Sequence, residues 1–252
     1  MQKDTLLSNR YHIDILLNAA GFTLVELMIA LLVSGFIMAS VVSVYIAQSK
    51  SYSEQDDIAN IQQDLRGALA ILPMEIRLAG CDPTESNVAG ILEATGSRFR
   101  FTMDVRGGAT NPNSADGDVN DDSEDVAYGF GANVDTDNDG IVDNGGANWS
   151  GTGSLGRQIG GAGGFQDLAD NVEAMEFNYV LEDGSTSLAP ANPARIRAVQ
   201  VSLLARAANP ASSGFLNTAT YTTASGVVWD PPDDNFRRRL VVTTIQCRNM
   251  GY

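Results

Sequence analysis

GFTLVELMIALLVSGFIMASVVSVYIA, residues 21–47, is the stretch that decides how this chain is built. After Glu26 no charged side chain occurs until Lys50. A bilayer core of about 30 Å takes roughly 20 apolar residues in a helix, so the stretch is long enough to cross a membrane. A carboxylate at the entrance of such a segment is costly, which indicates that Glu26 has a function.

The same stretch carries a signal for the start of a helix. Thr23 and Glu26 are spaced as a capping box, in which the two side chains accept hydrogen bonds from backbone N–H groups that the first turn leaves without partners. The helix dipole also favours a carboxylate at this end.

The helical pattern continues beyond the apolar run. Apolar residues recur at spacings of three and four, as on one face of a helix: Ile58, Ile61, Leu65, Leu69, Leu72, Ile76 and Ala79. Polar residues between them are expected to face solvent: Gln62, Asp64, Arg66 and Glu75. We therefore expect one long helix over residues 23–79, transmembrane in its first half.

Three positions bear on the course of this helix. Gly67 and Pro73 are its weak points, and Pro73 is expected to kink it or open it locally. Gly80 is suited to the C-terminal cap, and Pro83 follows.

After Cys81 the sequence changes to short β-like segments separated by Gly, Asn, Asp and Ser. Strands are expected at residues 88–92, 97–104, 126–130, 194–205 and 238–248, and residues 168–180 are expected to form a turn or short helix that leads into a strand. The predicted class is α+β, with an antiparallel sheet packed on the second half of the helix.

The composition limits the function. The chain has 252 residues and a formal net charge of −15, which argues against a nucleic-acid-binding face. Arg237, Arg238 and Arg239 form the one basic cluster, for which ion pairs are expected rather than DNA contacts. The one histidine, His12, lies near the N-terminus. Because acid–base catalysis and zinc hydrolysis sites commonly use histidine, we expect that the protein is not an enzyme.

Acidic residues gather in one part of the chain. Residues 104–146 hold eleven Asp or Glu and one Arg. They overlap residues 107–164, a region rich in Gly, Asn and Asp with few large apolar residues. We expect this region to be an acidic insertion that is mobile or ordered by a ligand.

One loop in this region has the spacing of a calcium site. Asp135, Asp137, Asp139, Ile141 and Asp143 match positions 1, 3, 5, 7 and 9 of an EF-hand-type loop, with Ile141 contributing its backbone carbonyl. Hard cations such as Ca²⁺ take six to eight oxygen ligands, and this spacing lets one loop supply several.

The match to the EF-hand loop is incomplete. Gly140 provides the sharp turn, but position 12 is Gly146 rather than Glu. The site is therefore more similar to the calcium loops of thrombospondin type 3 repeats or dockerins, or it takes a ligand from elsewhere. The alternative is an acidic turn without an ion. Residues 116–125 are a candidate second half-site.

The chain has two cysteines, Cys81 and Cys247. If the bulk of the chain lies outside the cytoplasm, a disulfide between them is favoured over two buried thiols.

The string GFTLVE, followed by the apolar run, resembles the processing site of type IV prepilins. In that family a peptidase cuts after the glycine, the new N-terminal phenylalanine is methylated, and the glutamate takes part in assembly. The resemblance implies a cut between Gly21 and Phe22 and an assembly role for Glu26. A plain signal anchor is the alternative. Arg10 is the last basic residue before Gly21, whereas most family members have one immediately before the glycine.

Segments of the head extend the resemblance. SYSEQDDIANIQQDLRGALAILPMEIRLAGC, LADNVEAMEFNYVLEDG, ARIRAVQVSLLARA and RRRLVVTTIQCRN resemble the PilW class of minor pilins, relatives of the J-type pseudopilins of type II secretion. The resemblance covers about two thirds of the mature chain. It implies a type IV pilin-like fold with a leader (1–21), a transmembrane or fibre-core helix (22–50), its amphipathic continuation (51–80) and a head (81–252).

The resemblance also implies a function. The expected protein is a minor pilin that helps to initiate or cap a type IV pilus, with the prepilin peptidase, other minor pilins, the major pilin and a tip adhesin as partners. Its expected place is the inner membrane before assembly and the extracellular pilus afterwards. Two alternatives are a tip pseudopilin of a type II secretion system and a calcium-dependent, membrane-anchored adhesin or ligand-binding ectodomain.

Overall fold

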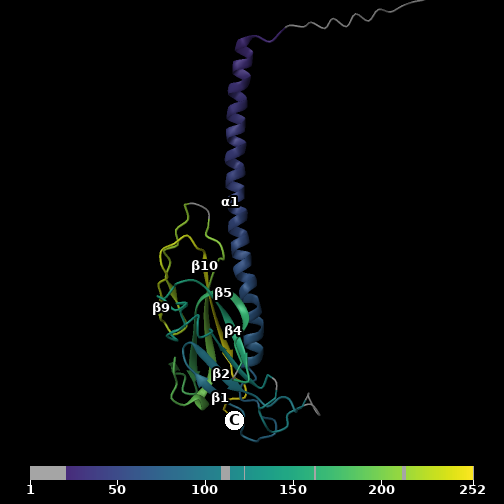
Figure 1. Cartoon of the computed structure of the whole chain (residues 1–252), viewed down its shortest axis with the longest axis vertical. Coiled ribbons are helices and arrows are strands. Elements are labelled where there is room, and N and C mark those ends of the chain that lie inside the picture. The colour runs from purple at the N-terminus through teal and green to yellow at the C-terminus, as the bar shows by residue number, and fades with distance from the viewer. Residues whose placement is uncertain (1–20, 109–113, 122, 162, 212–213, 252) are drawn as a thin grey trace, which may run out of the picture. The chain divides into compact units, whose positions relative to one another are not determined.

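The computed structural model describes residues 21–108, 114–121, 123–161, 163–211 and 214–251. It divides into two units, Met1–Ser49 and Lys50–Tyr252, which are considered in turn. The predicted leader lies outside the described residues except for Gly21. The helix α1, Leu24–Ile76, contributes residues to both units (Figure 1).

The first unit is the N-terminal half of α1 with the residues that precede it. All described side chains from 21 to 49 are exposed, including large apolar ones such as Phe36 and Tyr45. The helix is long and apolar enough to cross a membrane. Ser40 and Ser43 donate hydrogen bonds of 2.9 Å to carbonyl oxygens one turn earlier. Ser34 also donates to a carbonyl oxygen one turn earlier, that of Ala30. These serines therefore present no unsatisfied hydroxyl to apolar surroundings.

In the second unit the remainder of α1 buries one face. Most of the predicted apolar face is buried: Ile61, Leu65, Leu72 and Ile76, together with Ala68, which was not predicted. Ile58, predicted on the same face, is exposed. The predicted boundary at residue 79 is three residues too late, because the helix ends at Ile76 and continues as a turn. Gly80 is the last residue of that turn and has a left-handed φ of 74°. The helix assignment is uninterrupted at Pro73.

Most strands of the head belong to one antiparallel sheet. Its strands are β1 (Ile91–Ala94), β2 (Arg98–Thr102), β3 (Asp125–Gly129), β4 (Gly153–Ile159), β5 (Gln166–Leu181), β6 (Thr186–Ser187), β7 (Ile196–Arg206) and β10 (Arg238–Gln246). The order is β1-β2-β3-β4-β5-β7-β10, and β6 pairs with the end of β5. A second, two-stranded sheet joins β8 (Tyr221–Thr222) and β9 (Val228–Trp229), and a short 3₁₀ helix (Pro193–Arg195) precedes β7 (Figure 1).

The main core lies between the second half of α1 and one face of this sheet. Alternate residues of β2 and β5 enter it, among them Phe99, Phe101, Phe177 and Tyr179. Their rings pack with centroid separations of 5.2 Å for Phe99 with Phe101 and 5.6 Å for Phe99 with Tyr179. The predicted α+β fold, a long helix packed on an antiparallel sheet, is confirmed.

Residues 107–164 differ from the prediction. They are not an insertion outside the sheet, because they supply β3 and β4, which lie between β2 and β5. β3 was expected within one residue of its position, whereas β4 was missed. The beginning of β5, expected to be a turn or short helix, is also strand and contains a bulge between Val172 and Ala174.

Candidate functional site

The predicted processing site lies where α1 begins. Gly21 and Phe22 precede the helix, and Phe22 exposes 91% of its surface. The capping box is confirmed. The Thr23 backbone N–H and hydroxyl donate to Glu26 Oε2 at 2.8 and 2.9 Å, and the Glu26 N–H donates to Thr23 Oγ1 at 3.2 Å. The peptide bond expected to be cut is thus outside the helix, and Glu26 is fixed in its first turn.

The acidic loop at residues 135–143 is attached to the middle of β5. The Met175 N–H donates to the Gly140 carbonyl at 2.8 Å, and the Val142 N–H donates to the Glu173 carbonyl at 2.9 Å. Gly140 has a left-handed φ of 86°, and a Cβ there would lie 2.3 Å from the Met175 carbonyl oxygen. The loop therefore needs glycine at this position to approach the strand.

Three of the five predicted calcium ligands come together. Carboxylate oxygens of Asp135, Asp137 and Asp143 all lie within 4.8 Å of one another. Asp139 is not part of this group. Its carboxylate accepts hydrogen bonds from the Ile141 N–H at 2.8 Å and from Asn148 Nδ2 at 2.6 Å. Ile141 forms an isolated bridge with Ala174 on β5.

The carboxylates in this cluster have different environments. Burial raises the pKa of Asp135 to about 6, against the lowering effect of the hydrogen bond that it accepts from the Gly140 N–H. Asp143 has a lowered pKa because the Thr136 hydroxyl and the Gly145 N–H donate to it. A cluster of three acids, two of them buried, has the oxygen donors that a hard cation needs.

The candidate second half-site forms a separate cluster. Carboxylate oxygens of Asp116, Asp118 and Asp121 lie within 4.8 Å of one another. The buried Asp104 accepts hydrogen bonds from the N–H groups of Asp116 and Gly117, both at 3.1 Å. Backbone donors thus hold this segment against the end of β2.

The two cysteines are free thiols in the structure, which does not contain the predicted disulfide. Both nevertheless pack in the main core, with Cys247 buried and Cys81 partly buried. Burial raises the pKa of Cys247 to about 12, and it also raises the pKa of Cys81. The disulfide stays a prediction for the oxidised chain. Alkylation of the unfolded chain without reductant tests it, because two labelled thiols would exclude the bond.

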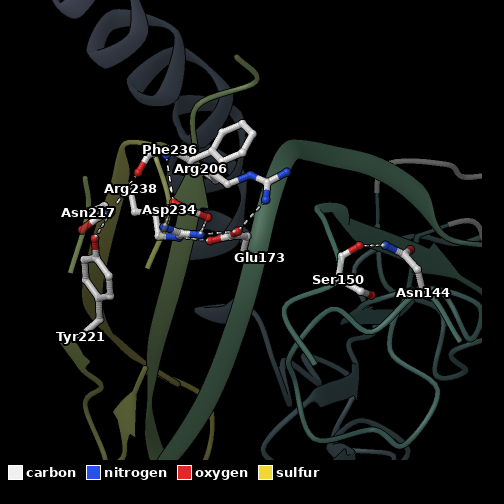
Figure 2. Close-up of polar contacts among 9 residues, drawn as sticks. All are labelled: Asn144, Ser150, Glu173, Arg206, Asn217, Tyr221, Asp234, Phe236 and Arg238. Carbon is white, nitrogen blue, oxygen red and sulfur yellow. Dashed lines mark hydrogen bonds and ion pairs between the residues drawn. The ribbon is translucent and has the colours of Figure 1, made fainter. Parts of the chain in front are cut away.

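Two arginines of the basic cluster, Arg237 and Arg238, make ion pairs as expected, whereas Arg239 forms none with the described residues. Arg237 pairs with Glu54 of α1 at 2.7 Å and lies over the ring of Phe215. Arg238 is almost fully buried and binds both Glu173 and Asp234. Figure 2 shows the Glu173 carboxylate between the guanidinium groups of Arg238 and Arg206. Arg206 Nη1 lies 3.0 Å from Glu173 Oε1. The hydrogen bonds to Asp234 and Glu173 outweigh burial and raise the pKa of Arg238.

A second buried ion pair was not predicted. Glu75, expected to face solvent, accepts two hydrogen bonds of 2.9 Å from Arg157 of β4 and one from the hydroxyl of Tyr128. Both charged side chains expose about one seventh of their surface. Asp64 was also expected in solvent and instead accepts a hydrogen bond of 2.8 Å from Asn171. Local spacing gives no signal for these contacts, because the partners lie 82 and 107 residues away.

Comparisons with known proteins bear on both ends of the chain. The model of the type IV pilus-assembly protein W family (PilW) matches residues 141–249, and that of the prokaryotic N-terminal methylation motif matches residues 16–42. No curated protein matches the chain. A solved type IV-like pilin from Thermus thermophilus is similar over 79% of this chain and 97% of its own, with 15% identity and a TM-score of 0.44.

The two family matches fall on the features described above. The methylation motif includes Gly21, Phe22 and Glu26, and the PilW match runs from the acidic loop through β4, β5, β7 and β10. The chain is therefore similar to the PilW family of type IV pilus-assembly proteins over residues 141–249 and carries a prokaryotic N-terminal methylation motif.

Proposed function

We propose that this chain is a minor pilin, a structural subunit that helps to initiate or cap a type IV pilus after its leader is removed. One observation carries the proposal: the apolar half of α1 exposes its large apolar side chains, while the head has a hydrophobic core of its own. An exposed apolar surface of this length needs a bilayer or neighbouring helices. In our proposal this apolar surface is first covered by the inner membrane and is later covered by neighbouring helices of the fibre.

Cleavage between Gly21 and Phe22 prepares the helix for the fibre. The prepilin peptidase is the proposed enzyme, and the new amine of Phe22 is then methylated. Thr23 donates only to Oε2 of Glu26, and within the described residues no group donates a hydrogen bond to Oε1. Oε1 is therefore available to the Phe22 amine of an adjacent subunit. Such a pair in apolar surroundings sets register, and it is strongly destabilising to remove one of its members.

The assembly role of Glu26 is tested by Glu26→Ala in cells that make pili. We expect fewer pili and loss of the variant from sheared fibres, with normal amounts of the chain in the inner membrane. Glu85→Ala, which removes an exposed carboxylate of the head, is the matched control and should be incorporated normally. Normal pilus number and normal incorporation of Glu26→Ala would contradict the proposal.

Two other assignments predict different outcomes. A tip pseudopilin of a type II secretion system would be encoded among secretion genes, and its loss would block secretion rather than pilus formation. A membrane-anchored adhesin or ligand-binding ectodomain would stay uncleaved and monomeric in the inner membrane. The proposed subunit instead contacts other minor pilins, the major pilin and a tip adhesin, and it has no catalytic function.

We also propose that the acidic loop binds Ca²⁺ through Asp135, Asp137 and Asp143. The convergence of these three carboxylates supports the proposal, and a bound cation would offset their mutual repulsion. Asp139, predicted as a ligand, does not converge with these three carboxylates and is left out of the proposed set.

A stability measurement with two arms tests the calcium site. In chelator at neutral pH, Asp135→Asn should stabilise the head by about 1 kcal/mol, because a folded-state pKa above the unfolded value makes the ionised carboxylate unfavourable there. In calcium the order should reverse, because only the wild type gains binding energy, about 2.7 kcal/mol at 100 times the Kd. The exposed Asp167→Asn is the control. Equal wild-type stability in calcium and in chelator would show that the loop binds no calcium.

A further inference from the structure

A cavity of about 430 Å³ lies on the sheet face that does not carry the main core. Its lining includes Asp139, Trp149, Glu176, Trp229 and Asp230. Ala174 and Glu176 of β5 point to this face, because their neighbours Met175 and Phe177 enter the core with α1. The volume is within the range of small-molecule sites.

Both tryptophans of the chain line this cavity. Trp229 exposes 4% of its surface and packs with Ala174 and Leu204, and the partly buried Trp149 packs against the same cluster. Trp149 has a φ of 67°, a left-handed conformation that is unfavourable for a bulky residue. Such strain is often found where a side chain is held in place for binding.

The acidic side of the cavity has no matching cation. Glu176 exposes 6% of its surface, and its carboxylate accepts hydrogen bonds from the hydroxyl and N–H of Ser225, at 2.8 and 3.3 Å. Among the described residues no arginine or lysine forms an ion pair with it, and none lines the cavity. Asp139 and Asp230 add two more carboxylates at the exposed rim.

Glu173, on the same strand, shows how the fold treats a buried carboxylate when its role is structural. It is fully buried and paired with two arginines, Arg206 and Arg238 (Figure 2). Buried charges are normally paired in this way, because an uncompensated charge costs several kcal/mol. Glu176 differs in having an open cavity beside it in place of an arginine.

We propose that this cavity binds an alkylammonium group. A cation compensates Glu176 and is attracted to the indole faces, while its alkyl part contacts apolar lining such as Ile141. An anionic ligand would be repelled by the three carboxylates. A neutral sugar would leave the charge of Glu176 uncompensated.

The proposed site is distinct from the calcium cluster. Asp139 lines the cavity and is not among the three carboxylates that converge in the loop. The two sites share the loop that holds them, so the binding experiment is done at constant calcium concentration.

Fluorescence tests the proposal on the full chain in a neutral detergent, since both tryptophans lie at the site. The probes are choline and n-butylammonium, titrated at constant ionic strength. The neutral isostere of choline, 3,3-dimethylbutan-1-ol, controls for apolar binding. We expect a saturable change with an ammonium probe and at least tenfold weaker binding to the isostere.

Variants then assign the binding to this cavity. Glu176→Gln keeps an acceptor for Ser225 and should weaken ammonium binding at least tenfold. Asp230→Asn, an exposed change that should not affect folding, should weaken it about two- to threefold. Asp167→Asn lies outside the cavity and should bind as the wild type does. The absence of a saturable response to either cation would overturn the proposal, as would an equal response to the isostere or a response to a sugar panel alone. Unchanged ammonium affinity in folded Glu176→Gln and Asp230→Asn would also overturn it.

Discussion

Leu32 and Leu72 are leucines of one helix, yet Leu32 exposes 62% of its surface and Leu72 is fully buried. The same difference separates the two halves of α1. The first half exposes all its apolar side chains, whereas the second half packs one face in the core of the head. A helix whose apolar residues find no partner in their own chain is suited to a bilayer or a fibre. A helix that packs on its own sheet stabilises a domain.

Truncation of one leucine in each half gives the largest expected contrast. Leu72→Ala leaves a cavity in the core and should lower the unfolding free energy of the head by about 3 kcal/mol. Leu32→Ala should leave it unchanged. Urea unfolding in detergent measures both, because the two tryptophans lie in the head and report on it alone. Equal losses in the two variants would show that the halves are not independent.

Glu75 and Glu26 extend the contrast to charged residues. Glu75→Ala leaves Arg157 without its ion pair and Tyr128 without its acceptor, so the head should lose about 3 kcal/mol. Glu26→Ala should leave head stability unchanged and act on pilus incorporation instead. Unfolding curves and sheared-pilus fractions of both variants check this. A stability loss in Glu26→Ala would contradict the separation of roles.

Gly67 and Gly35 provide the smallest contrast. A Cβ on Gly67 would lie 3.0 Å from the Leu168 carbonyl oxygen on β5, whereas a Cβ on Gly35 would contact nothing within 4 Å. Gly67→Ala should therefore destabilise the head by about 1 kcal/mol, because crowding exceeds the gain in helix propensity. Gly35→Ala should have no effect on the head. The urea midpoints of the two variants measure this effect. A head that is more stable in Gly67→Ala than in the wild type would show that β5 moves away from the new methyl group without loss of stability.

Sequence periodicity was sufficient for the parts of the fold that depend on local pattern. The apolar spacing predicted the buried face of α1 from Ile61 to Ile76, although Ile58 is exposed. The alternation in β2 and the apolar content of β7 and β10 predicted strands within a few residues of their bounds. β4 was missed because its sequence, GSLGRQI, has two glycines and only two large apolar residues. It is held in the sheet by pairing with β3 and β5 rather than by its own pattern.

The candidate sites show the same limit. Spacing alone predicted that Asp135, Asp137 and Asp143 would converge, because the turn that joins them is local. It did not predict that Arg157 would pair with Glu75, because this contact depends on how distant segments meet. It also did not predict that Asn148, nine residues further along the chain, would bind Asp139. That Glu176 has no ion-pair partner among the described residues could not be recognised from sequence, because the chain has many other acids and ion pairs are visible only in three dimensions.

The N-terminus of the chain recovered from sheared pili tests most directly whether the exposed half of α1 is built into a fibre. Mass spectrometry of that fraction should find a chain that begins at Phe22 with a methylated amine. A chain that retains the residues before Phe22, stays in the inner membrane and is absent from the pilus fraction would contradict the account.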